Sequence, residues 1–320
     1  MHREVTMTST TGEQISVCLL TYNHAHIIES TVASIQQQSL SGYEIIISDD
    51  CSTDGTWEKV VEIAETDPRI IAIQTPKNCG MPGNANYAVD HARRSYIALL
   101  HHDDIYRYDL LEKWSDVLDR HPDVAFVFNQ YHVYGTDFIY PSPFATGKID
   151  GIHLLKHHLF ATWGCAVRGT AMIRRDAWLQ VGGMREQFNL LADIDLWMRL
   201  AMRWNVGYVA EPVMTIRSQR PANYAEMYSD VSFSWSRKRY LYKIHATNRL
   251  SFYDLNTMKG AYYWWVFRVR LNLESVKWLA YAVVRKRKDM ISSCRDGATS
   301  YDLLPLRIIR TVLLRSMRFV

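Results

Sequence analysis

Cysteine is scarce in this chain of 320 residues, and its five copies lie far apart. No two of them form a C-x-x-C pair, the spacing typical of structural zinc sites and redox-active cysteine pairs. Scattered single cysteines are typical of reduced thiols in a cytosol. The sequence therefore argues against a disulfide framework and against a zinc site. The five residues are Cys18, Cys51, Cys79, Cys165 and Cys294.

Glycine-rich phosphate-binding loops are also missing. Neither G-x-G-x-x-G nor G-x-x-x-x-G-K-[ST] occurs anywhere in the sequence. These loops bind phosphate groups in dinucleotide enzymes and in P-loop ATPases, so their absence counts against both classes. The segment that starts at Asp50 resembles the opening of an EF-hand. However, Val61 occupies the twelfth position, where that calcium loop needs a bidentate glutamate.

Long hydrophobic runs are absent as well. No stretch reaches the roughly 18 apolar residues that a membrane-spanning helix needs. The first residues are polar and rich in threonine, without the basic and then apolar pattern of a secretory signal. We therefore expect a protein that is soluble or peripheral to a membrane rather than integral.

Basic residues concentrate at the end of the chain. Residues 237–320 carry 18 Lys and Arg against 5 Asp and Glu, whereas the remaining residues carry 19 against 28. This partition differs from a general nucleic-acid signature, and we expect no nucleic-acid partner. Four arginines fall on one side of a helical wheel over residues 303–320, opposite mainly apolar residues. Such a tail suits an anionic membrane surface, the alternative being a helix packed on protein.

The first half of the chain alternates between strand-like and helix-like segments. Apolar runs predict strands at residues 15–22, 43–48, 69–75, 96–100 and 124–131, and amphipathic segments predict helices at 27–38, 56–66, 84–93 and 110–120. This order predicts an α/β fold with a mainly parallel, Rossmann-like sheet and helices on both faces. We expect residues 135–150 to form a loop. Aromatic, basic helices should follow from about residue 231.

Polar residues follow four of the predicted strands, at residues 21–23, 49–55, 78–86 and 103–104. Because ligands bind at the carboxyl ends of parallel strands, these residues predict a site at one edge of the sheet. The adjacent Asp103 and Asp104 repel each other, so such a pair usually meets water or a cation. Carboxylate oxygens are the ligands that Mg²⁺ and Mn²⁺ prefer.

A second acidic pair, Asp193 and Asp195, stands at the start of a helix predicted near residue 191. Acidic side chains in a first turn are favoured by the helix dipole, which is a purely structural explanation. The functional explanation is that one of the two carboxylates faces the site as a general base. The pattern alone leaves both explanations open.

Together these motifs resemble glycosyltransferase family 2, whose members have the GT-A fold. The resemblance rests on Thr21-Tyr22-Asn23, on residues 47–56, on Asn78-Cys79-Gly80, on the Asp103-Asp104 pair, and on Gly182-Gly183-Met184 with residues 193–199. It covers about residues 14–220, in order. It implies an inverting transfer of a sugar from a nucleotide-diphosphate sugar to an acceptor hydroxyl, with Mn²⁺ or Mg²⁺ as cofactor. We predict a GT-A catalytic domain at 14–230 and a helical, basic region at 231–320.

The resemblance also assigns roles to single residues. Thr21, Tyr22 and Asn23 would flank the nucleobase, and Asp50 would accept a hydrogen bond from its imide nitrogen. Asp103 would hold the ribose or the metal, and Asp104 would coordinate the cation that bridges the diphosphate. Asp193 would deprotonate the acceptor hydroxyl. A loop containing Asn78, Asn84 and Asn86 would shape the sugar-diphosphate pocket.

Three positions depart from the family pattern. His101 replaces the acidic residue that often precedes the Asp103-Asp104 pair, and Ala85 stands where many members have an arginine. The frequent Arg-x-His after the last strand appears here as Arg217-Ser218-Gln219. These departures leave the implied reaction class intact and affect metal affinity and donor identity.

The acceptor implied by the resemblance is a glycan or a lipid-linked glycan in cell-surface polysaccharide assembly. We therefore expect a cytoplasmic protein, peripheral on the inner face of the plasma membrane. A nucleotidyltransferase is one alternative, but it would need a glycine-rich phosphate loop that residues 20–26 lack. The other alternative is a non-catalytic GT-A scaffold that binds a nucleotide or a partner. The presence of Asp50, Asp103, Asp104 and Asp193 argues against it.

Overall fold

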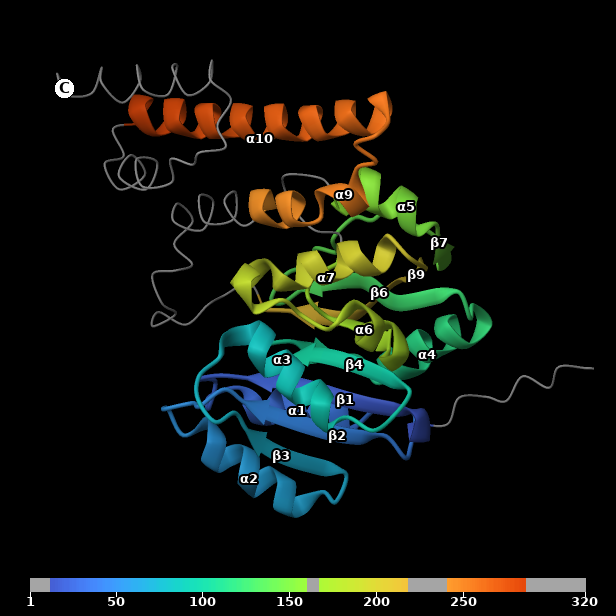
Figure 1. Cartoon of the computed structure of the whole chain (residues 1–320). Helices are drawn as coiled ribbons and strands as arrows, with labels where there is room; N and C mark the ends of the chain where they lie inside the picture. Colours follow the sequence, from blue (N-terminus) through green and yellow to red (C-terminus); the bar gives the residue numbers. More distant parts are fainter. Residues whose placement is uncertain (1–11, 160–166, 218–240, 286–320) are drawn as a thin grey trace, which may run out of the picture. The chain divides into compact units, whose positions relative to one another are not determined.

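The computed structural model describes residues 12–159, 167–217 and 241–285 (Figure 1). These residues belong to two compact units. The first contains residues up to 159 and residues 165–219, and the second contains residues 160–164 and 220–320. The domain boundary predicted at residue 230 lies outside the described residues and stays a prediction. The two units are described separately below.

The described residues of the first unit form a nine-stranded sheet in the order β3-β2-β1-β4-β8-β6-β9-β5, with β7 beside β9. The strands are β1 (Ile15–Thr21), β2 (Glu44–Asp49), β3 (Ile70–Gln74), β4 (Tyr96–His101), β5 (Ile105–Tyr106), β6 (Val124–Val133), β7 (Gly147–Ile149), β8 (Ala171–Arg174) and β9 (Asn205–Ile216). Strands β3, β2, β1, β4, β6 and β9 share one direction, and β8 runs antiparallel between β4 and β6. The predicted mainly parallel sheet is confirmed.

Helices cover both faces of this sheet, as predicted. Helices α1 (Ile28–Gln36), α2 (Thr56–Thr66) and α4 (Leu110–Arg120) share one hydrophobic core with the β1, β2 and β4 side chains that face them. Helix α3 (Gly80–His91) lies outside that core cluster and packs on β1 and β2. The other helical segments are α5 (Gly151–Leu154), η2 (Leu155–Leu159), α6 (Arg175–Val181), η3 (Glu186–Leu191) and α7 (Ala192–Ala201).

The register of the sheet brings the polar strand ends together. Every residue of β1 is buried, as expected for a strand covered on both faces. Its last residue, Thr21, pairs with Asp49 of β2, and the preceding Leu20 pairs with His101 of β4. The carboxyl ends of β1, β2 and β4 therefore meet at one edge.

Two local predictions were wrong. Strand β7 lies within residues 135–150, which we expected to form a loop without strands. Helix α3 begins at Gly80 rather than at residue 84. Asn84 and Asn86 lie in this helix and not in the loop that the family resemblance assigned to them. The early start has a physical cause, because the Asp50 carboxylate accepts hydrogen bonds from the backbone N–H groups of Cys79 and Gly80.

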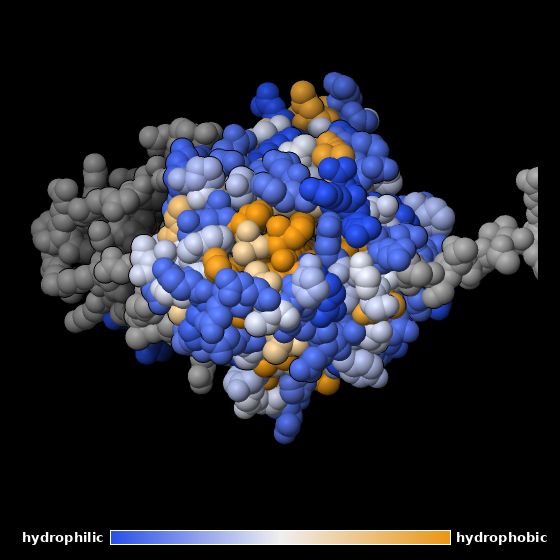
Figure 2. Space-filling view, turned by 90° about the horizontal axis from the view of Figure 1, so that it is seen from below, coloured by the Kyte–Doolittle hydropathy of each residue, from blue (hydrophilic) through white to orange (hydrophobic). Residues whose placement is uncertain are grey.

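Strand β3 is the edge strand at one side of this sheet. Its side chain Ile71 is 40% exposed, so this edge is only partly covered. Figure 2 shows a small group of hydrophobic side chains surrounded by hydrophilic ones on the face seen from below. Single exposed hydrophobic residues are common on protein surfaces and need no further explanation.

The second unit is helical in its described part. Residues 241–247 are helical and are followed by α9 (Arg249–Phe252) and α10 (Met258–Val284). An aromatic cluster joins them, with the His245 ring stacked 3.7 Å from the ring of Phe267. Among the helices of the described ranges, none is both long and apolar enough to cross a membrane. The tail predicted to dock on a membrane, residues 303–320, lies outside the described residues.

Candidate active site

The loops after β1 and β2 are joined by hydrogen bonds. The backbone N–H of Asn23 donates to Ser52 Oγ at 2.8 Å, and Asn23 Oδ1 accepts from the backbone N–H of Thr53 at 2.8 Å. Asn23 and Cys51 both have left-handed backbone angles, with φ of 54° and 58°. The predicted nucleotide-binding residue Asn23 therefore holds two site loops together. Next to it, Tyr22 is 42% exposed and Thr21 is buried.

Asp50 lies at the carboxyl end of β2 and fixes the start of α3. Its Oδ1 accepts from the Cys79 N–H at 2.9 Å and from the Thr75 hydroxyl at 3.0 Å, and its Oδ2 accepts from the Gly80 N–H at 2.8 Å. The Asn78 amide donates to the backbone oxygen of Asp50 at 3.1 Å. Oδ1 thus accepts more than one hydrogen bond and Oδ2 accepts one, and the predicted contact with a nucleobase stays a prediction.

The two asparagines of α3 position the wall of the site. The Asn84 amide donates to the backbone oxygen of Ser48 at 3.0 Å and accepts from the Ser48 hydroxyl at 2.5 Å. The Asn86 amide makes two hydrogen bonds of 2.9 Å with the backbone N–H and oxygen of Met184. The structure thus uses both side chains to join α3 to β2 and to the segment before η3.

The two carboxylates that follow β4 have different environments. Asp104 is buried, and burial together with the charge of Asp103 raises the pKa of its carboxyl well above the ordinary value. Burial also raises the pKa of Asp103, but the nearby His102, His101 and His24 outweigh this effect and leave the pKa below its ordinary value. The pKa of Asp103 is therefore lower than that of Asp104.

For the divalent cation implied by the predicted function, the side chains after β4 could supply some ligands but not a complete set. Within the described ranges, no three His, Cys, Asp or Glu side chains are grouped so that they could hold an ion by themselves. Mg²⁺ is often bound by one or two carboxylates together with substrate phosphates. Asp103 and Asp104 fit an ion of this kind, which the diphosphate would also ligate.

Two histidines line the base of this edge. His102 Nδ1 lies 2.9 Å from the backbone oxygen of Leu20, and His24 Nδ1 lies 2.7 Å from that of Tyr22. Burial is the main cause that lowers the pKa of His102 to about 3, and burial also lowers the pKa of His24. Both rings are therefore neutral at physiological pH. Sequence reasoning missed His24, whose only signal was its place shortly after β1.

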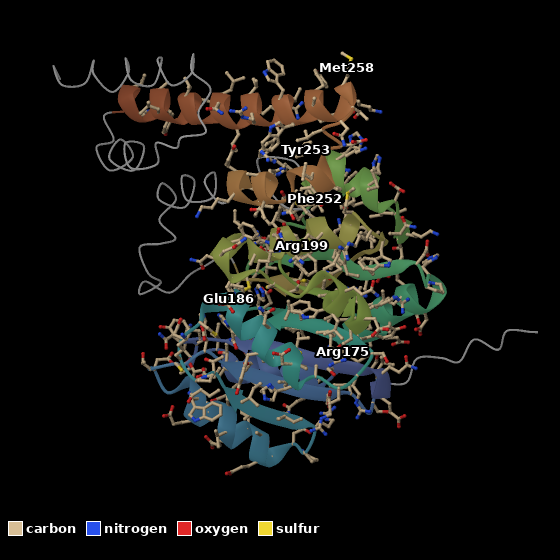
Figure 3. The ribbon with its side chains drawn as sticks, viewed as in Figure 1. Arg175, Glu186, Arg199, Phe252, Tyr253 and Met258 are labelled. Atoms are coloured by element: carbon tan, nitrogen blue, oxygen red, sulfur yellow. The ribbon has the colours of Figure 1, made fainter. Side chains whose placement is uncertain are left out.

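The structure distinguishes the two acidic residues of α7. Asp195 is fully buried and accepts a hydrogen bond from Arg199 Nε at 2.7 Å, while Arg185 lies 3.6 Å away. Arg199, labelled in Figure 3, also donates to the backbone oxygens of Val181 and Gly183 at 2.7 Å. Asp195 is therefore held inside the protein by an ion pair.

Asp193 is half-buried and faces the end of β4. A β-carbon added at Gly169 would lie 3.5 Å from Asp193 Oδ2 and 3.3 Å from His101 Nε2. The Asp193 carboxylate and the His101 ring therefore both lie close to Gly169. Sequence reasoning singled out Asp193 but missed Gly169 and its neighbour Arg168, because no recognisable pattern precedes β8.

The curled, mainly parallel sheet has polar and acidic side chains at one edge. This arrangement defines a protein of the GT-A class. A family model described as glycosyl transferase family 2 matches residues 16–182. The chain therefore belongs to glycosyl transferase family 2.

Several curated relatives are similar to this chain. It is 36% identical over 123 residues to the putative teichuronic acid biosynthesis glycosyltransferase TuaG of Bacillus subtilis, covering 38% of this chain and 48% of TuaG. It is 29% identical over 219 residues to the putative glycosyltransferase EpsE of Bacillus subtilis, covering 66% of this chain and 75% of EpsE. The UDP-Glc:alpha-D-GlcNAc-diphosphoundecaprenol beta-1,3-glucosyltransferase WfgD of Escherichia coli is 27% identical over 143 residues, covering 45% of this chain and 55% of WfgD. The chain thus spans about half the length of TuaG and of WfgD.

Solved structures share the fold. TarS residues 1–349 of S. aureus, in complex with UDP-GlcNAc, has a TM-score of 0.62 at 14% identity, covering 96% of this chain and 90% of that one. The mannosyltransferase PcManGT from Pyrobaculum calidifontis, in complex with GDP-Man and Mn²⁺, has a TM-score of 0.57 at 18% identity, covering 96% and 86%. At these identities the likeness shows the GT-A fold alone.

Proposed function

We propose that this chain transfers a sugar, with inversion, from a nucleotide-diphosphate sugar to an acceptor hydroxyl, and that the reaction depends on Mn²⁺ or Mg²⁺. The observation that carries this proposal is that the two acidic residues of α7 have different surroundings. Asp195 is buried in an ion pair, whereas the Asp193 carboxylate lies close to Gly169 and to the His101 ring at the end of β4. A half-buried carboxylate near the strand ends suits a general base.

The chemistry follows from these positions. Asp193 would take the proton of the acceptor hydroxyl, whose oxygen then forms a bond to the anomeric carbon of the donor sugar. The bond between that carbon and the diphosphate oxygen breaks, and the nucleotide diphosphate leaves from the opposite face. Asp103 and Asp104 would hold a divalent cation, which supplies stabilisation of the charge on the leaving diphosphate.

Replacing the base tests this proposal. The Asp193→Asn variant should lose at least about 10²-fold in turnover, because an amide cannot accept the proton. Its affinity for the nucleotide should change little, since the lost interaction belongs to the transition state. Turnover would be measured with a panel of UDP- and GDP-sugars and Mn²⁺, and nucleotide binding by calorimetry.

A matched control is the Asp176→Asn variant, which removes an exposed acidic residue from the first turn of the neighbouring helix α6. This variant should retain wild-type turnover. If Asp193→Asn keeps more than about a tenth of the wild-type rate, the base is another group. If the wild-type chain binds nucleotide but turns over no sugar donor in the panel, the result favours the alternative of a non-catalytic GT-A scaffold.

We further propose a glycan or lipid-linked acceptor in the assembly of cell-surface polysaccharide. The names of TuaG and WfgD support this class of acceptor. A cytoplasmic site on the inner face of the plasma membrane would bring the enzyme to such an acceptor, with residues 303–320 as the membrane-binding segment. Liposome flotation tests this part: binding should require anionic lipid, fall with salt, and be lost when residues 303–320 are deleted. Equal flotation without that segment would contradict its role.

A further inference from the structure

The last residues of β6 begin a short hairpin that carries exposed aromatic side chains. The backbone N–H of Val133 donates to the backbone oxygen of Phe138 at 3.0 Å. The backbone N–H of Tyr140 donates to the backbone oxygen of Tyr131, also at 3.0 Å. Because these hydrogen bonds fold the segment back on β6, residues 131–140 have a defined conformation. We call them the aromatic hairpin.

Three aromatic side chains of this hairpin are exposed. Tyr134 and Phe138 are each 53% exposed, and Tyr140 is 47% exposed. The Tyr140 ring stacks on the buried Tyr131 ring, with 4.9 Å between the ring centres and 22° between the ring planes. The Phe138 ring stands at 89° to the Tyr140 ring, with their centres 6.3 Å apart. Exposed rings gathered in this way are typical of a binding surface rather than of scattered surface residues.

The aromatic hairpin lies at the same edge of the sheet as the candidate active site. Strand β8 is antiparallel to both β4 and β6, so β4 and β6 end at the same edge. Arg217 contacts both regions. Its guanidinium lies 5.3 Å from the centre of the Tyr134 ring, and its Nη1 donates to the backbone oxygen of Asp103 at 3.4 Å. The exposed rings are therefore continuous with the site at the end of β4.

A second connection leads from the hairpin towards the proposed base. The guanidinium of Arg168, an exposed residue, lies 5.4 Å from the centre of the Tyr131 ring. The next residue in the chain is Gly169, which lies close to the Asp193 carboxylate. The aromatic hairpin is therefore on the side of the site where an acceptor hydroxyl would meet its base.

We propose that the aromatic hairpin binds sugar rings of a glycan acceptor, with Phe138 and Tyr140 as the surface on which a ring stacks. This inference rests on the proposed function and adds to it a subsite for acceptor rings other than the one that reacts. The face of an aromatic ring carries partial negative charge, so it packs well against the C–H groups of a sugar ring, and a tyrosine hydroxyl can bond to sugar hydroxyls.

The lipid chain of a lipid-linked acceptor is the other occupant that exposed rings could bind. A hydrocarbon chain would remove water from the guanidinium groups of Arg168 and Arg217 without replacing the lost hydrogen bonds, which is costly. Sugar hydroxyls can accept hydrogen bonds from both groups. The arginines that border the rings therefore favour a glycan.

An array of bacterial surface oligosaccharides on hydrophilic linkers, from single sugars upward in length, tests the proposal with the full chain. UDP or GDP and Mn²⁺ would be present. The wild type should retain some oligosaccharides and bind them more tightly than single sugars. For the oligosaccharide bound best, calorimetry should show that Phe138→Ala and Tyr140→Ala each weaken binding by roughly tenfold or more, as expected for removing a central aromatic side chain. Tyr140→Phe, which keeps the ring, should lose much less. Decyl phosphate, the probe for a lipid chain, should bind the wild type and both alanine variants equally.

Tyr108→Ala is the matched control, because it removes a tyrosine that is 64% exposed from the segment between β5 and α4. It should bind the oligosaccharide like the wild type. UDP and GDP would be titrated into every sample, and equal losses for nucleotide and oligosaccharide would overturn the inference, as structural damage.

Three other results would overturn the inference while leaving the proposed function standing, provided that the wild type binds UDP or GDP. These are retention of no oligosaccharide by the wild type, unchanged oligosaccharide binding in both alanine variants, and tight binding of decyl phosphate that both alanine variants lose. Failure of the wild type to bind either nucleotide would overturn the inference and the proposed function together.

Discussion

A β-carbon added at Gly169 would lie 2.8 Å from Cε1 of His101, 3.3 Å from its Nε2 and 3.5 Å from Oδ2 of Asp193. Contacts of 2.8 Å are too short for carbon atoms, so Gly169→Ala forces the His101 ring or the strand end to move. The ring cannot move freely because its Nε2 atom is buried. We therefore expect the methyl group to push the strand end or the ring aside and to displace the Asp193 carboxylate.

The loss of stability expected for Gly169→Ala has two contributions. Gly169 has a left-handed backbone with φ of +83°, and an alanine in that conformation costs about 1–2 kcal/mol. Overpacking against His101 adds about 1–3 kcal/mol of destabilisation. A misplacement of catalytic groups by about 1 Å costs about 10²-fold in rate. The variant should therefore lose about 2–5 kcal/mol of stability and most of its turnover.

The Gly135→Ala variant separates the cost of the left-handed backbone from the cost of overpacking. Gly135 has nearly the same backbone angle, φ of +73°, but no atom lies within 4 Å of its added β-carbon. This control should lose only the stability that the left-handed backbone costs, and it should keep wild-type turnover. Urea unfolding and sugar turnover would be measured for both variants. If Gly169→Ala matches Gly135→Ala in rate within about threefold, the position of the Asp193 carboxylate beside Gly169 does not matter for the reaction.

Three further outcomes are expected. Asp104→Ala should weaken Mn²⁺-dependent UDP or GDP binding, with excess chelator acting similarly on the wild type; full activity in chelator would contradict this. Arg199→Met should destabilise the first unit by about 3–5 kcal/mol in urea unfolding, because it leaves the buried Asp195 charge unpaired; a smaller loss would mean that Arg185 takes over. Burial lowers the pKa of His245 to about 3, whereas it is about 6.5 in the unfolded chain. Since the unfolded state binds the proton more tightly, the free energy of unfolding should fall as pH drops from about 6.5 towards 3. The His245→Phe variant should remove this dependence. Unfolding measured over this pH range checks both expectations.

Much of the sheet was predictable because its central strands are apolar along their whole length. Strands β1, β2 and β4 are buried on both faces, so burial leaves a continuous apolar run in the sequence. Strand β8 is different. It has four residues and takes its place between β4 and β6 by pairing with segments far away in the chain. No local pattern carries that information.

The start of α3 was mispredicted for a related reason. The Asp50 carboxylate, thirty positions earlier than Gly80, accepts the N–H groups that begin the helix. A cap supplied by a distant residue leaves no signal in the helix sequence, unlike a local Ser or Asp cap. The family resemblance assigned Asn84 and Asn86 to a loop, whereas the structure places them in this helix, where their amides join neighbouring segments.

The family resemblance assigned the role of base to Asp193, and helix geometry gives a further reason to prefer it over Asp195. Residues two apart on a helix point about 200° away from each other, so only one of these two carboxylates can face the interior. A carboxylate is held most easily by a basic side chain four residues later. Asp195 has Arg199 at that position and forms the ion pair, whereas the residue four positions after Asp193 is Trp197. The carboxylate without an i+4 cation on its own helix is Asp193, which lies close to Gly169 and which we propose as the general base.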